Sequence, residues 1–316
     1  MSTFSDDVAV TALVPQQGES AAKFAVEESL STAQRLLTTV PVRGMQEGVR
    51  LADFPEPAPL STHGPARIVA VCNQKGGVGK TTTSINLSAA LAEYGRKVLL
   101  VDFDPQGALA VGLGINPLGL DRTVLDLLLG QASLDDCLLK TSVPGLDLIP
   151  ANIDLSGAEL ALANEVAREN TLARVLSAAV SDYDYIIIDC QPSLGLLTVN
   201  ALTAADSVLI PLQCEYFALR GVGLLSDIIA KVRSRLNPRL EIEGIVGTMY
   251  DARTTHSREV LERIEQAFGD KVFRTTIGRT VKFPDATVAG TPITEFASSS
   301  TGAGAYRQLA REVLSR

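Results

Sequence analysis

The 316-residue sequence lacks tryptophan and has only two histidines, His63 and His256, and four widely spaced cysteines. Two histidines cannot supply a histidine-rich metal site, and the cysteines form neither a CxxC pair nor a cluster of zinc-binding spacing. A metalloenzyme built on such ligands is therefore not expected. Cysteines spaced in this way, inside or beside apolar runs, are typical of buried, reduced thiols in a cytosolic protein.

Long apolar segments are missing as well. No stretch approaches the roughly 18 consecutive apolar residues of a membrane-spanning helix. Asp6 and Asp7 precede the first basic residue, which is unlike the positively charged start of a secretory signal. The sequence therefore predicts a cytoplasmic protein that is neither exported nor inserted in a membrane.

Basic residues gather in one part of an acidic chain. The formal net charge of -8 argues against a protein that coats nucleic acid with its whole surface. Residues 231–282 nevertheless hold eleven bases and seven acids, a local balance of +4 that leaves -12 for the rest of the chain. This segment suits either a basic face that contacts phosphates nonspecifically or a solvated helix face with i,i+4 pairs such as Glu259 with Arg263.

The composition changes at about residue 67. Residues 1–66 hold eight acids and four bases, show no strand-like alternation and end in a proline- and serine-containing stretch. They predict a largely disordered N-terminal extension with one candidate helix over residues 21–37. The remaining residues, 67–316, are expected to form a single domain.

Short β-branched runs alternate with longer helical patterns from residue 67 onward. The runs cover residues 67–73, 97–103, 146–151, 185–190, 206–213, 241–250 and 271–277, and the clearest helical patterns cover 81–94, 172–181, 219–236, 257–268 and 303–315. Several runs are apolar at consecutive positions, as in strands covered on both faces. The pattern predicts an α/β fold with a doubly wound, mostly parallel sheet, helices on both faces, and ligands at the carboxyl ends of the strands.

A glycine-rich segment follows the first predicted strand and opens the first predicted helix. Its residues are Lys75, Gly76, Gly77, Val78, Gly79, Lys80, Thr81 and Thr82. This context predicts a phosphate-binding loop, because glycines let backbone N–H groups and the helix N-terminus wrap closely around phosphates. Lys80 is expected to bind the β and γ phosphates, and the Thr81 hydroxyl to bind Mg²⁺.

Three acids end predicted strands near this loop. Asp102 and Asp104 end the second strand, and Asp189 ends the apolar run YIIIDC. At the carboxyl edge of such a sheet, acids order magnesium waters or a nucleophile, although Asp102 alternatively caps the next segment. Asp189 fits the Walker B pattern of a residue that holds Mg²⁺ through water. No NKxD motif for guanine is present, so ATP is favoured over GTP.

Four motifs together resemble the deviant Walker A family of ParA and MinD ATPases, and in particular its Soj-like partitioning branch. They are KGGVGKTT at 75–82, DFDPQG at 102–107, TMYDART at 248–254 and GAGAYRQLAREVL at 302–314. By this resemblance Lys75 is the signature lysine, which reaches across an ATP-bound sandwich homodimer to the ATP of the partner, and Asp104 orients the attacking water. Lys75, Lys80 and Asp104 are then the catalytic residues of a slow ATPase.

The resemblance also implies binding partners. The ATP-bound dimer is expected to bind DNA nonspecifically through Arg253 and Lys282, with Arg279 as a neighbour, and a ParB-like or other protein is expected to stimulate hydrolysis. The implied function is chromosome or plasmid partitioning, or positioning of division machinery, by a cytoplasmic, nucleoid-associated protein without a membrane partner.

Several positions depart from the family pattern. Gln191 replaces a frequent proline and Arg220 a usual glutamate, whereas Gln74 departs only from the general phosphate-loop pattern GxxxxGK[ST], in which a glycine stands at that position. We hypothesise that Gln191 alters the hydrolysis rate or the switch geometry. Residues 278–287 correspond to a loop that usually lies near the adenine, and Thr287 stands there in place of proline.

Other functions stay open at this point. One is an orphan ParA-like regulator of a protein partner in cell division that does not bind DNA. Another is a metabolic or maturation enzyme on the same scaffold, either a nucleotide-dependent ligase or an iron-sulfur carrier, although the carrier would need closely spaced cysteines. The final helix has a small apolar stripe that includes Tyr306 and Leu309, which favours packing on the core over targeting a membrane.

Overall fold

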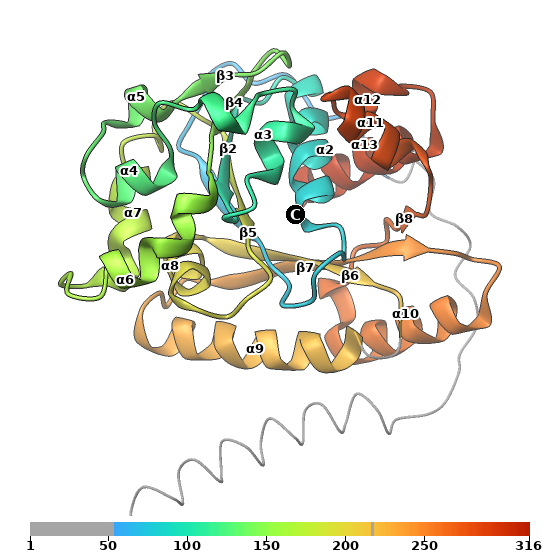
Figure 1. Ribbon diagram of the computed structural model, residues 1–316. Helices are drawn as coiled ribbons and strands as arrows, with labels where there is room; N and C mark the ends of the chain where they lie inside the picture. Colours follow the sequence, from blue (N-terminus) through green and yellow to red (C-terminus); the bar gives the residue numbers. More distant parts are fainter. Residues whose placement is uncertain (1–53, 216–217) are drawn as a thin grey trace, which may run out of the picture.

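The computed structural model describes residues 54–215 and 218–316, which form one parallel-sheet core covered by helices (Figure 1). The predicted helix over residues 21–37 lies outside the described residues, so the division into extension and ATPase domain stays a prediction. The strands of the described residues are β1 (Arg67–Val71), β2 (Val98–Phe103), β3 (Leu139–Lys140), β4 (Leu146–Ile149), β5 (Tyr185–Cys190), β6 (Ser207–Gln213), β7 (Glu241–Tyr250) and β8 (Ile277–Gly278).

The strands form one 8-stranded sheet in the order β3-β4-β2-β5-β1-β6-β7-β8. Only β3 pairs antiparallel, at the edge beside β4, and the other strand pairs are parallel. The predicted fold class is therefore confirmed. Strands β1 and β5 lie side by side at the centre, with Val71 opposite Asp189, and β2 pairs with the other edge of β5, with Asp102 also opposite Asp189. The chain direction thus brings the residues that follow these strands to the same edge of the sheet.

Helices cover both faces of the sheet. They are α2 (Lys80–Glu93), α3 (Ala108–Gly112), α4 (Val124–Leu128), α5 (Leu134–Cys137), α6 (Ala158–Ala161), α7 (Thr171–Leu176), α8 (Leu196–Ala204), α9 (Ala218–Arg235), α10 (Thr255–Phe268), α11 (Lys282–Ala289), α12 (Ile293–Phe296) and α13 (Thr301–Leu314). Figure 1 shows α9 and α10 along one side of the sheet, and α2 with α11, α12 and α13 gathered on the other side. No helix of the described residues is long and apolar enough to cross a membrane.

Alternate residues of each strand enter two separate apolar cores. In β1, Ile68 and Ala70 join the core under α7, α8 and α9, whereas Val69 and Val71 join the core under α2 and α13. Because both faces are buried, nearly every position of the central strands is apolar, as the consecutive apolar runs predicted. This two-sided burial fixes the strand ends that carry the polar loops.

The last helix packs on the core, as its apolar stripe predicted. Tyr306, Leu309 and Val313 are buried, and the Tyr306 hydroxyl lies 3.2 Å from the hydroxyl of Thr83 on α2. The helix begins at an N-cap, Ser300, whose hydroxyl accepts a hydrogen bond from the Ala303 N–H. The C-terminal segment therefore supports the helix that follows the glycine-rich loop.

The prediction of a continuous strand over residues 271–277 was wrong. Only Ile277 at its end belongs to a strand, and Val272 forms an isolated bridge with Ile245. The buried carboxylate of Glu312 on α13 accepts hydrogen bonds from the N–H groups of Arg274 and Thr275, at 2.8 and 3.0 Å. A side chain thus satisfies backbone donors that a strand would give to its neighbour. The predicted helix over 172–181 is also shorter, since α7 ends at Leu176.

Residues 54–66 lie along the body of the protein without regular structure. The guanidinium of Arg96 donates to the carbonyl of Ala58 at 2.9 Å, and Nδ1 of His63 lies 2.7 Å from the carboxylate of Asp184. Arg311 on α13 lies 3.4 Å from the carbonyl of Phe54. This part of the predicted extension is therefore held by contacts with elements on the edge opposite to the glycine-rich loop and with the last helix.

Candidate nucleotide-binding site

The glycine-rich loop has the backbone conformation that its sequence requires. Gly77 and Gly79 have φ angles of 72° and 90°, a left-handed region in which other residues are strained. Helix α2 begins at Lys80, directly after Gly79, so its free N–H groups face the loop. The Val78 carbonyl accepts a hydrogen bond from the Thr248 hydroxyl at 2.8 Å, which ties the loop to β7. A preformed cradle of N–H donors at a helix N-terminus suits an anionic ligand.

Asp189 lies at the centre of a hydroxyl cluster beside this loop. Its two carboxylate oxygens accept hydrogen bonds from the hydroxyls of Thr81, at 2.6 Å, and Ser84, at 2.9 Å. The side chain is fully buried, and burial raises the pKa of Asp189 to about 6, while the bonds from Thr81 and Ser84 and the nearby Lys80 act in the opposite direction. A carboxylate and a hydroxyl that converge in this way match the oxygen ligands that Mg²⁺ prefers.

The two aspartates after β2 have different surroundings. Asp102 is fully buried and accepts hydrogen bonds from the N–H groups of Asp104 and Leu109, at 3.2 and 3.1 Å. Burial, and then the charge of Asp189, raise the pKa of the Asp102 carboxyl well above its ordinary value. Asp104 is half-buried, and its carboxylate accepts a hydrogen bond from the Gln106 N–H at 3.0 Å. Asp102 therefore orders the turn that presents Asp104.

The two lysines of the loop point to different places. The Lys80 ammonium lies 3.3 Å from the carbonyl of Lys75 and is buried, so it stays inside the loop. The Lys75 ammonium leaves the loop and donates to Glu215 at 2.8 Å and to Gln213 at 3.0 Å, at the end of β6. The structure thus keeps Lys80 with the phosphate cradle and holds Lys75 beside it at the protein surface.

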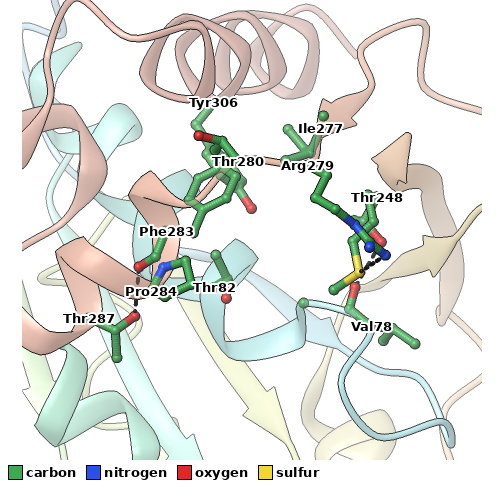
Figure 2. Close-up of a pocket in the computed structure, with 13 residues that line it drawn as sticks. Val78, Thr82, Thr248, Ile277, Arg279, Thr280, Phe283, Pro284, Thr287 and Tyr306 are labelled. Atoms are coloured by element: carbon green, nitrogen blue, oxygen red, sulfur yellow. Dashed lines mark hydrogen bonds between the residues drawn. The ribbon is translucent and has the colours of Figure 1, made fainter. Parts of the chain in front are cut away.

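A cavity of about 440 Å³ opens beside the start of α2 (Figure 2). Its lining comes from the loop, from the ends of β7 and β8, and from α2, α11 and α13: Val78, Gly79, Thr82, Thr248, Met249, Ile277, Gly278, Arg279, Thr280, Phe283, Pro284, Thr287 and Tyr306. Phe283 and Tyr306 meet edge to face with ring centroids 5.7 Å apart. The cavity is mostly apolar with a few polar groups, as binding sites for flat organic rings are. Residues 278–287 therefore lie next to the phosphate cradle.

The three predicted DNA-contacting residues are all exposed. Arg253 and Arg279 line the same surface hollow of about 480 Å³ beyond the ends of β6 and β7, and Lys282, the first residue of α11, is not part of its lining. The Arg253 guanidinium forms two hydrogen bonds of 2.9 Å with the carboxylate of Asp251. A guanidinium nitrogen of Arg279 lies 3.9 Å from the sulfur of Met249 (Figure 2).

Two of the unusual residues lie near the loop that follows β5. Gln191 is half-buried in that loop, and its carbonyl accepts a hydrogen bond from the Ser193 N–H at 2.9 Å. Arg220 is exposed in the first turn of α9 and lines, together with Lys75, a hollow of about 620 Å³. Arg220 forms no hydrogen bond or ion pair within residues 54–215 and 218–316.

Some residues of the site were not predicted from the sequence. Ser84 bonds the same carboxylate as Thr81, and its position three residues later on a helix could have indicated a shared face. Phe283 lies in the stretch 278–287 that was expected near the adenine, whereas Tyr306 carried no such signal, because it reaches the cavity only through the packing of α13 against α2.

Comparison with known proteins places this site in a family. A family model described as an AAA domain matches residues 66–242. The chromosome partitioning protein ParA of Caulobacter vibrioides is 50% identical over 254 residues, which cover 80% of this chain and 95% of that protein. The sporulation initiation inhibitor protein Soj of Bacillus subtilis is 51% identical over 247 residues, which cover 78% of this chain and 98% of that protein.

Solved structures share the fold and hold nucleotides. Cobyrinic acid a,c-diamide synthase from Mycobacterium smegmatis with bound ADP and magnesium is 45% identical with a TM-score of 0.70, over 79% of this chain and 94% of that one. The septum site-determining protein MinD from Pyrococcus horikoshii, complexed with Mg-ADP, is 27% identical with a TM-score of 0.64, over 78% of this chain and 96% of that one. These matches confirm the expected activity and cofactors. The chain belongs to the ParA/Soj family of P-loop ATPases and is an ATPase whose cofactors are ATP and Mg²⁺.

Proposed function

We propose that the protein is an ATP-dependent, dimerising switch that binds DNA nonspecifically and serves chromosome or plasmid partitioning, or the positioning of division machinery, at the nucleoid. A ParB-like or other protein stimulates hydrolysis and release. The observation that carries the proposal is the hydrogen bond of 2.6 Å from the Thr81 hydroxyl to the Asp189 carboxylate, beside the loop that holds Lys75 and Lys80. It occurs in a chain that is 50% identical to a chromosome partitioning ParA over 254 residues.

We assign the phosphates to the N–H groups of Gly76 to Thr82 and to the Lys80 ammonium. Thr81 and Asp189 hold Mg²⁺, which when bound neutralises charge on the phosphate oxygens. Asp104, presented by the turn that Asp102 orders, orients the attacking water. Phosphoryl transfer needs positioning and charge neutralisation more than covalent chemistry, so this small set of groups suffices.

The adenine occupies the cavity beside α2 in this proposal. Its apolar lining, with Phe283 and Tyr306 on one side, would exclude water from a purine ring. The cavity adjoins Gly79 and Thr82, so a base bound there leaves its phosphates at the glycine-rich loop.

The ATP-bound dimer contacts DNA through Arg253, Arg279 and Lys282 in this proposal. All three are exposed and belong to a segment with a local balance of +4. Contacts to phosphates by such residues give salt-sensitive binding without sequence preference. Lys75 acts on the ATP of the partner copy and therefore has to leave Glu215, with which it now pairs.

An amide-forming ligase is the second candidate, because a 45% identical solved structure carries the name of a diamide synthase. Such an enzyme turns over ATP in proportion to a carboxylate substrate and a nitrogen donor, whereas the partitioning switch responds to DNA and a protein partner. Measuring ATP turnover with cobyrinic acid plus a nitrogen donor, and separately with duplex DNA, separates the two functions. Stimulation only by the former would overturn the partitioning proposal.

A variant series tests the assigned lysines. Lys80→Ala is expected to lose ATP binding. Lys75→Ala is expected to bind ATP but to hydrolyse it at least about 100-fold more slowly, because a positive charge beside the transferring phosphoryl group is lost. Lys97→Ala, at an exposed lysine on the opposite edge, is the matched control. Nucleotide binding and ATP-dependent dimerisation are measured by titration and analytical ultracentrifugation. Equal turnover in Lys75→Ala and the control would contradict the role of Lys75.

A further inference from the structure

One segment touches both of the loops that carry acids at the site. The segment, residues 151–161, follows β4 and is here named the bridging segment. Its first residue, Ala151, packs against the turn after Asp104: a Cβ on Gly107 would lie 2.8 Å from the Ala151 carbonyl oxygen. Gly107 has a φ angle of 62°, so both its backbone and its surroundings favour glycine. The turn that presents Asp104 therefore rests directly on the bridging segment.

The other end of the bridging segment reaches the helix after the Asp189 loop. Glu159 on α6 accepts a hydrogen bond of 2.9 Å from the N–H of Leu196, the first residue of α8. The N-cap residue of α8 is Gly195, which offers no side-chain acceptor. Glu159 thus supplies from another element the capping oxygen that the helix itself lacks, and its negative charge suits a helix N-terminus.

The loop between Asp189 and α8 has few other anchors at its far end. Residues 191–195 form no regular structure, and the Thr198 hydroxyl donates to the Ser193 carbonyl at 2.6 Å. A Cβ on Gly195 would collide with the Glu159 carboxylate, so the loop and Glu159 are closely packed. Movement of Glu159 would therefore displace the start of α8 and the loop that leads to it.

We propose that the bridging segment sets the distance between the Asp104 turn and the Asp189 loop, and that Glu159 is a positioning residue for ATP hydrolysis. Glu159 touches neither nucleotide contacts nor magnesium ligands and acts through α8. The phosphate cradle and the cavity beside α2 are built from other residues. Loss of Glu159 should therefore slow the chemical step and leave ATP binding unchanged. The inference rests on the ATPase activity and does not depend on DNA binding.

Steady-state ATP hydrolysis by the full chain with Mg²⁺ tests this inference. Glu159→Ala is expected to lower kcat about tenfold and to leave KM for ATP within about twofold, since small displacements of catalytic groups cost rate more than binding. Glu159→Gln keeps an acceptor oxygen for the Leu196 N–H and should retain most of the activity. Glu165→Ala changes an exposed glutamate nearby that forms no side-chain hydrogen bond or ion pair within the described residues, and should match the wild type.

Thermal unfolding of the same variants separates positioning from folding. Loss of one capping hydrogen bond destabilises a protein only modestly, so removal of the exposed Glu159 should lower Tm by no more than a few degrees. The proposal is overturned if kcat of Glu159→Ala stays within about twofold of the wild type, if KM rises as much as kcat falls, or if Glu159→Gln fails to rescue the rate. A loss of rate that follows a loss of Tm across the variants would likewise assign Glu159 a merely structural role.

Discussion

At the residue scale, the site contains a buried carboxylate, Asp189, whose hydrogen-bonding needs are met by hydroxyl groups. Asp189 has no exposed surface, and two hydroxyls, those of Thr81 and Ser84, bond its two oxygens. A buried charge without such partners would be costly. Hydroxyls can also rotate, so Thr81 can turn its oxygen toward a bound ion while Ser84 keeps the carboxylate in place.

Ser84 should therefore control the affinity for Mg²⁺ without touching the ion. Ser84→Ala is expected to raise the Mg²⁺ concentration for half-maximal ATP hydrolysis about tenfold, which is typical of groups that orient a metal ligand. Ser88→Ala is a matched control one helical turn later, since the Ser88 hydroxyl is buried and has no hydrogen-bond partner within the part of the chain that the structure describes. Magnesium titration of the ATPase rate measures both. An equal shift in the two variants would contradict the role of Ser84.

At the element scale, the sequence predicted what is encoded locally. The strand, glycine-rich loop and helix of residues 67–93 are consecutive in the chain, so their motif could be recognised from the sequence. The position of the acids at the strand ends followed from the expected parallel sheet. Of the cavity lining, the stretch 278–287 was expected near the adenine from the family resemblance, but the place of Tyr306 could not be predicted, because it lies more than 200 residues from Thr83, which it contacts. Residues 271–277 look like a strand by composition, but Glu312 on α13 binds their backbone. Only tertiary packing reveals such a contact.

Glu312 should therefore stabilise the junction between β7, β8 and α13. Its carboxylate is buried and accepts two backbone N–H donors. Glu312→Ala is expected to lower the free energy of unfolding by about 3 kcal/mol, because buried donors lose a charged acceptor. Glu295→Ala, at an exposed glutamate of α12, should change it by less than about 0.5 kcal/mol. Urea unfolding measures both, and a similar small change in the two variants would contradict this role.

In the turn between β7 and α10, Asp251 is expected to limit the proposed contact of Arg253 with DNA. Asp251 occupies the guanidinium of Arg253 with two hydrogen bonds, in the geometry that a phosphate would use, and the Arg253 hydrogen bonds hold the pKa of Asp251 at about 2. We expect Asp251→Asn to bind duplex DNA several-fold more tightly and with a steeper salt dependence, by about 0.9 in slope. Fluorescence anisotropy at several salt concentrations measures this.

An exposed acid elsewhere in the basic segment controls for net charge. Asp270→Asn removes the same charge from a side chain that forms no ion pair within the described residues. It should change DNA affinity much less than Asp251→Asn. Weaker binding by Asp251→Asn would show that Asp251 orients Arg253 for DNA instead of competing with it.

At the scale of the whole molecule, charge and nucleotide have to act together. The chain is acidic overall, with a net charge of -8, and its basic excess lies in residues 231–282. In the proposed function, a single copy presents only a small basic face on a protein that DNA otherwise repels. Two copies held together by ATP would double that face, and nonspecific affinity rises steeply with the number of phosphate contacts. The proposed ATP-dependent dimerisation would thus explain how a weak DNA-binding face becomes a switchable one.

The most direct test is binding of random duplex DNA with ATP, with ADP and without nucleotide, at two salt concentrations. The account predicts salt-sensitive binding by the wild type only with ATP. It also predicts loss of that binding in Lys80→Ala, which lacks the nucleotide, and in the Arg253→Glu/Lys282→Glu variant, which keeps the nucleotide but loses the basic face. Wild-type protein that binds ATP but ignores DNA in every nucleotide state would contradict the account.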